Sequence, residues 1–180
     1  MGGYYGTALA AAAYKGEQEI VSLLLDKGAD VNAVGGYYGT ALAVAACQGK
    51  KKTVLLLLDK GADVNAVGGH YGTALAVAAC QGKQELVSLL LDKGADVNAV
   101  GGHYGSALGA VTNRTKREIV SLLLDKGADT TNIVTGKFGT VLGEPPCLGT
   151  CHMRVLTEKI RCSHLPQLDR NRITAAETWG

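Results

Sequence analysis

The chain has 180 residues, of which 47% are hydrophobic and only 5% aromatic, and its formal net charge is +2. This small charge lacks the basic excess that binding to a phosphate backbone requires, so we do not expect a nucleic-acid partner. No apolar run approaches the roughly 18–20 residues of a membrane span, so we expect no membrane association either.

A 33-residue period organises the first three quarters of the sequence. The stretch Lys-Gly-Ala-Asp-Val-Asn-Ala-Val-Gly-Gly at 60–69 recurs at 27–36 and at 93–102, and its first four residues recur at 126–129. A fixed period of this size predicts stacked supersecondary units, none of which can bury its own apolar face alone. The repeats are predicted at 2–34, 35–67, 68–100 and 101–133.

Each repeat is predicted to hold two short helices and an extended loop, as the third repeat illustrates. Thr73 can cap a first helix over Ala74–Cys80, and Gly82 can end it in a left-handed conformation. Leucines at helical spacing predict a second helix over about Gln84–Lys93. Residues 96–105 then predict an excursion whose glycines permit a turn.

The repeat weakens and then stops towards the C-terminus. In the fourth repeat, Gly109 replaces the alanine found at Ala76. A partial fifth repeat is predicted at 134–142, and Pro145-Pro146 would break its first helix. Residues 1–142 are therefore predicted as the repeat domain, and residues 143–180 as a disordered or loosely attached tail.

The order of these motifs resembles ankyrin repeats. The matching segments are Thr-Ala-Leu-Ala-Val-Ala-Ala at 40–46 and 73–79, then a glycine, a leucine-rich helix and Gly-Ala-Asp-Val-Asn-Ala. The glycine-rich loops are similar to those of long fungal ankyrin arrays. The resemblance implies an all-α ankyrin-repeat solenoid, in which helix-turn-helix units are joined by β-hairpin-like loops. Ala41 and Ala43 depart from the Pro and His that the family carries at these positions.

The resemblance also implies a protein–protein interaction module that binds a protein partner through its concave face. Its variable positions lie at the loop tips and on the first helices. Carried over to this chain, they are Tyr4, Tyr5, Tyr14, Lys15, Tyr37, Tyr38, Gln48, His70, Tyr71, Gln81, His103, Tyr104, Asn113 and Arg114. An alternative for each tyrosine pair is that one ring only packs between adjacent tips, which applies to Tyr38, Tyr71 and Tyr104 more than to Tyr37.

Several patterns could suggest chemistry, and we interpret each one more simply. Cys147, Cys151, His152, Cys162 and His164 could supply zinc ligands, but their spacing is not a common closed pattern. His70 and His103 could bind metal or sense pH, yet their alternation with tyrosine favours a variable surface position. The recurring glycine pairs lack the Gly-Lys-Ser/Thr of a phosphate loop, and the recurring Asp is expected to hold a turn. We therefore predict no enzymatic activity, no catalytic residues, no cofactor and no metal.

A second functional hypothesis is that the array is a structural spacer or a self-association fragment of a longer multi-domain signalling protein. Its basis is that Ala8, Leu9, Ala12 and Leu23 have no preceding repeat to cover them. Weak self-association would then use this uncapped first repeat. Because the five cysteines are an odd number and no secretion signal is evident, we expect reduced thiols and a cytoplasmic location.

Overall fold

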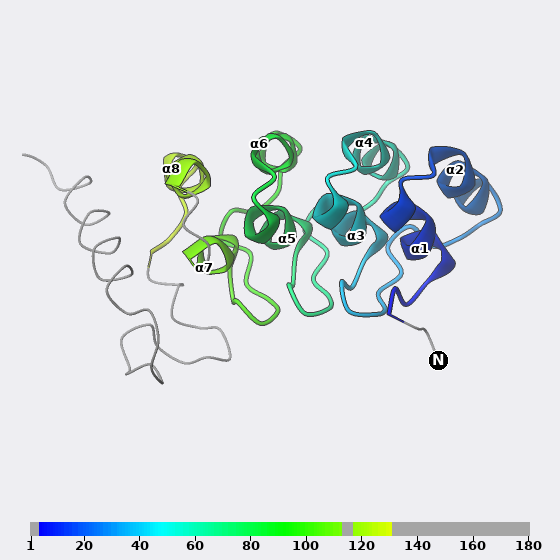
Figure 1. Cartoon of the computed structure of the whole chain (residues 1–180), viewed down its shortest axis with the longest axis horizontal. Helices are drawn as coiled ribbons and strands as arrows, with labels where there is room; N and C mark the ends of the chain where they lie inside the picture. The colour runs from blue at the N-terminus through cyan, green and yellow to red at the C-terminus, as the bar shows by residue number, and fades with distance from the viewer. Residues whose placement is uncertain (1–3, 113–116, 131–180) are drawn as a thin grey trace, which may run out of the picture. The chain divides into compact units, whose positions relative to one another are not determined.

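Pairs of short helices form the described part of the protein. The computed structural model describes residues 4–112 and 117–130, and within them the chain forms eight helices and no extended strand (Figure 1). Their bounds are α1 (Ala8–Lys15), α2 (Gln18–Asp26), α3 (Ala41–Gln48), α4 (Lys51–Asp59), α5 (Ala74–Gln81), α6 (Gln84–Asp92), α7 (Ala107–Thr112) and α8 (Arg117–Asp125). The all-α repeat architecture predicted from the sequence is confirmed.

Local capping explains where the first helices of repeats one to three begin and end. The Thr73 hydroxyl accepts a hydrogen bond from the Ala76 amide at 3.1 Å, and Gly82 closes α5 with φ of 70°. Thr40 and Gly49 do the same for α3. The predicted caps are therefore confirmed. The helices differ from the prediction by one residue each, since α5 runs on to Gln81 and α6 ends at Asp92.

The helices form two layers. The first helices, α1, α3, α5 and α7, pack against one another in sequence, and each also packs against the second helix of its own repeat. In Figure 1 the first helices lie between the second helices and the hairpin loops. In α5 every residue except Gln81 is buried, which requires the small Ala and Val side chains that the sequence supplies.

A side-chain ladder links the turns that follow the second helices. Asp63 Oδ1 accepts the Asn65 amide at 2.8 Å, which holds the turn within its own repeat as predicted. The Asn65 side chain reaches the next repeat, where it donates to the Gly94 carbonyl at 3.3 Å and accepts the Asp96 amide at 2.7 Å. Asn32 and Asn98 make the same pairs of bonds. The asparagines therefore fix the register between repeats.

The exposed end of the first repeat differs in part from the prediction. Leu23 is 57% exposed and Ala8 is exposed, as expected. Leu9 and Ala12 are buried instead, so the prediction for these two residues was wrong. The reason is that α1 packs against both α2 and α3, which cover these two side chains without a preceding repeat.

The C-terminal predictions concern residues outside the described ones. These are the partial fifth repeat at 134–142, the tail at 143–180 and the cysteines and histidines of the tail. Asn113 and Arg114 also lie outside the described residues. None of the helices in the described ranges combines the length and apolarity needed to cross a bilayer.

Candidate functional site

Glycines bring neighbouring hairpin loops into backbone contact. The Gly68 amide donates to the Gly72 carbonyl at 2.7 Å and closes the hairpin, and Gly72 has φ of 86°. A Cβ atom on Gly72 would lie 2.5 Å from the carbonyl carbon of Gly101 in the next hairpin. The backbones are so close that no residue with a side chain fits at position 72 without a shift of the neighbouring hairpin. The recurring glycines therefore serve close approach between repeats as well as the turn itself.

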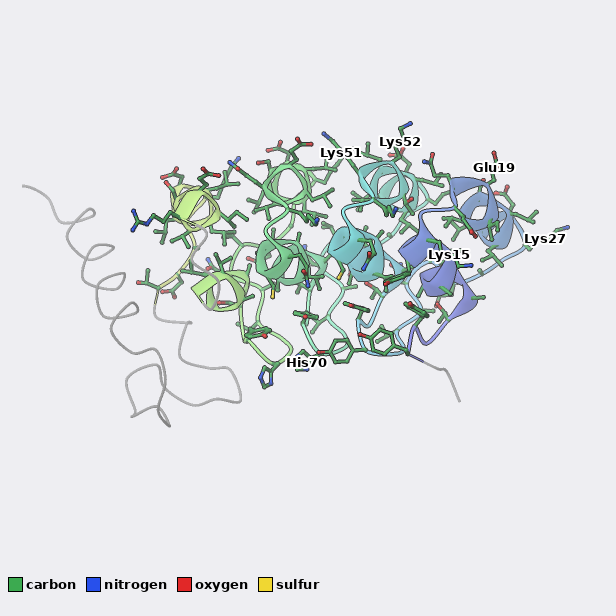
Figure 2. All side chains as sticks on the ribbon, viewed as in Figure 1. Lys15, Glu19, Lys27, Lys51, Lys52 and His70 are labelled. Atoms are coloured by element: carbon green, nitrogen blue, oxygen red, sulfur yellow. The ribbon has the colours of Figure 1, made fainter. Side chains whose placement is uncertain are left out.

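Four aromatic side chains at the hairpin tips form one stack, which we call the outer aromatic row: Tyr4, Tyr37, His70 and His103. Successive ring centroids are 5.4, 4.8 and 4.5 Å apart, and successive planes are inclined by 10°, 13° and 21°. Backbone hydrogen bonds run beside the rings, from the His70 amide to the Tyr37 carbonyl and from the His103 amide to the His70 carbonyl, both 2.6 Å. Figure 2 shows His70 at a hairpin tip, pointing away from the helices. Tyr4 and Tyr37 are 56% and 37% exposed.

Three further tyrosines, Tyr38, Tyr71 and Tyr104, form an inner aromatic row behind the first. Their rings stack at 5.9 and 5.8 Å and meet the outer rings edge to face. Burial, together with a hydrogen bond to the Cys47 thiol, raises the pKa of Tyr38, and burial raises the pKa of Tyr71 to about 12. Tyr38 is buried, as are the thiols of Cys47 and Cys80. The inner row therefore packs the hairpins onto the first helices.

The stacking distances show how the repeats converge at this edge. Equivalent rings in neighbouring repeats lie 4.5–5.9 Å apart, whereas packed helices stand about 8–10 Å apart. The repeats therefore fan out from the hairpin tips towards the helices. The outer aromatic row follows the tightest edge of the array, where successive side chains touch.

Seven of the fourteen predicted partner-binding residues lie in the two aromatic rows at this edge. Tyr5 meets Tyr4 of the outer aromatic row edge to face at 5.4 Å and packs on Tyr14, with ring centroids 4.7 Å apart. Lys15 is exposed and its Nζ lies 3.9 Å from a Glu17 carboxylate oxygen, a surface pair of little energetic value. Gln48 and Gln81 are partly buried at the ends of α3 and α5.

Sequence reasoning missed a row of exposed valines beside the hairpins. Val34, Val67 and Val100 are 59%, 50% and 52% exposed, and the Val34 and Val67 side chains lie over glycines of the next hairpin. Their 33-residue spacing was the signal that could have found them. With the outer aromatic row they make an edge whose hairpin residues, 34–40 and 67–73, include no acidic side chain, lysine or arginine.

Among the described residues, no group of three or more His, Cys, Asp or Glu side chains could hold a metal ion. A family model described as ankyrin repeats (3 copies) matches residues 3–68 and 37–101. Comparison with curated proteins gives no match.

Proposed function

The chain belongs to the ankyrin-repeat family, and from this premise we propose that it binds a protein partner through its hairpin edge and the adjoining face of the first helices. Ankyrin repeats generally serve as protein–protein interaction modules. The observation that carries the proposal for this chain is the outer aromatic row, which leaves Tyr4 and Tyr37 well exposed.

Preorganisation makes these rings suitable anchors. Each ring of the outer aromatic row is already held by its stacked neighbour and by the backbone bonds between tips. Binding therefore costs less side-chain entropy than it would for a free tyrosine. Tyrosine also offers a large apolar area with a hydrogen-bonding hydroxyl, the combination that dominates binding hot spots.

The chemistry of the edge also indicates which kind of partner surface would bind to it. Exposed valines flank the rings, and the hairpins carry no charged side chain at neutral pH. A complementary surface would bury apolar groups and offer hydrogen bonds to tyrosine hydroxyls, and its affinity would depend weakly on salt. Cys47 and Cys80 are reduced cysteines, which supports the cytoplasmic location that we propose for this complex.

Removal of the exposed rings should abolish capture of the partner. We expect the double variant Tyr4→Ala/Tyr37→Ala to retain at least tenfold less of the specifically bound proteins than wild type in pull-downs from a lysate of the source organism, read by quantitative mass spectrometry. The matched control is Lys51→Ala/Lys52→Ala, on the far side of the repeats (Figure 2), which should capture the same proteins as wild type. Equal capture by the tyrosine variant, with its fold intact by circular dichroism, would contradict the assignment.

A second candidate function, self-association, is favoured by the exposed face of the first repeat. Ile20 and Leu23 are 45% and 57% exposed. At the positions equivalent to Ile20, Thr53, Leu86 and Ile119 are 1–2% exposed, because the preceding repeat covers them. The first repeat therefore presents a surface that repeat stacking normally buries.

For this second candidate, we expect the weight-average mass from light scattering to rise with concentration for wild type. The variant Ile20→Glu/Leu23→Glu should stay monomeric, because two carboxylates cannot be buried unpaired in the contact. Lys27→Glu changes the net charge by the same amount at the exposed end of the same helix and should associate like wild type (Figure 2). A wild-type mass that does not change with concentration would exclude self-association through this face.

A further inference from the structure

The outer aromatic row is made of two chemically different halves. Repeats one and two contribute Tyr4 and Tyr37, whereas repeats three and four contribute His70 and His103 at the same position. The two histidine rings have the shortest centroid distance in the row, 4.5 Å, with planes 21° from parallel. Tyrosine stays neutral below about pH 10, whereas histidine titrates between pH 5 and 8. Only one half of the row can therefore acquire charge under mildly acidic conditions.

The surroundings of His70 favour its uncharged form. His70 is stacked on Tyr37 at 4.8 Å and meets Tyr71 and Tyr104 edge to face at 5.3 and 6.0 Å. His103 meets Tyr104 edge to face at 5.2 Å. None of these neighbouring rings carries a negative charge at neutral pH, so none compensates a proton on His70. Burial and the nearby His103 both lower the pKa of His70.

The lowered pKa of His70 determines how the stability of the fold changes with pH. A pKa lower in the folded state than in the unfolded chain means that the native protein binds fewer protons than the unfolded one. The contribution of His70 to stability is therefore fully present above the ordinary histidine pKa of about 6.5, and it is lost as the pH falls through the lowered value. Acid should weaken the array at this pair.

We propose that the His70–His103 stack makes the partner-binding edge pH-sensitive: when both rings are protonated, the tips of repeats three and four separate and the partner is released. The release step rests on the proposed function, whereas the separation of the tips does not. Like charges at stacking distance repel, and each imidazolium gains more hydration when it leaves the stack. The Tyr4–Tyr37 half stays assembled and localises the change to the later repeats.

The chain itself provides the control variant. Replacing both histidines with the residue of repeats one and two, in His70→Tyr/His103→Tyr, gives an all-tyrosine row that the fold already accommodates. We expect the wild-type Tm to fall between pH 7.5 and 5.0 by at least about 3 °C more than the Tm of this variant, with a chelator present throughout. His152 and His164 are common to both proteins and cancel in the comparison.

A second measurement does not depend on global unfolding. In the single variant His103→Tyr, NMR titration should give His70 a higher pKa than in wild type, because the neighbouring charge has been removed. For the release step, capture of the partner should fall at least fivefold between pH 7.5 and 5.5 for wild type and remain within twofold for the all-tyrosine variant. The proposed pH sensitivity is overturned if the Tm of wild type and of the all-tyrosine variant depend equally on pH. It is also overturned if the pKa of His70 is unchanged in His103→Tyr. Failure of the proposed function would show separately, as unaltered capture by Tyr4→Ala/Tyr37→Ala at pH 7.5.

Discussion

Replacing Gly72 with alanine should destabilise the protein by about 2–5 kcal/mol. Two effects combine. An alanine at φ of 86° is strained by about 1–2 kcal/mol. Its Cβ would also lie 2.5 Å from the carbonyl carbon and oxygen of Gly101, so the neighbouring hairpin must move, which adds about 1–3 kcal/mol. Urea unfolding followed by circular dichroism would measure the loss.

Gly94 separates the two effects. Its φ is 88°, nearly that of Gly72, yet a Cβ atom there would have nothing within 4 Å. Gly94→Ala should therefore cost only the strain, about 1–2 kcal/mol. An equal loss of stability in both variants would mean that hairpin contact contributes nothing. The larger loss at Gly72 would show that backbone contact between hairpins holds the aromatic edge together.

The parts of the fold that could be predicted from the sequence depend on local chemistry. The Thr73 cap and the Gly82 stop each need only neighbouring residues, and the structure confirms both. The 33-residue period can be read directly from the sequence. The link from Asn65 to Gly94 joins residues 29 apart. Its existence depends on how two repeats stack, which propensity and pattern do not specify.

The candidate site likewise combines features predicted from local sequence with contacts between repeats. The pattern predicts two aromatic residues at each hairpin tip, and it favours Tyr38 over Tyr37 as the ring that packs between tips. Tyr37 is 37% exposed and the adjacent Tyr38 is 9% exposed. Tyr38 lies against Cys47 and stacks on Tyr71 of the next repeat at 5.9 Å, whereas Tyr37 stays at the edge. The stack between repeats depends on how the repeats pack, which no sequence window specifies.

The leucine-rich second helices carry the other large effect that we expect. Leu90 in α6 is 0% exposed and lies in one of the two central helix pairs of the described residues, and its truncation to alanine should cost about 2–5 kcal/mol. The neighbouring α5 consists largely of small buried side chains, and Leu75 is the one leucine among them, so little of α5 can turn into the cavity. The same substitution at Leu23, which is 57% exposed, should cost about 0.5 kcal/mol or less.

Urea unfolding of Leu90→Ala and Leu23→Ala would compare the two sites directly. A difference below about 0.5 kcal/mol would contradict a core built on the second helices. The large cost expected at Leu90 has a reason beyond its cavity. A helix of nine residues is not stable alone, so α6 exists only while it packs on its neighbours. Because each repeat is stabilised through its interfaces, damage at Leu90 weakens repeats two and four as well as its own.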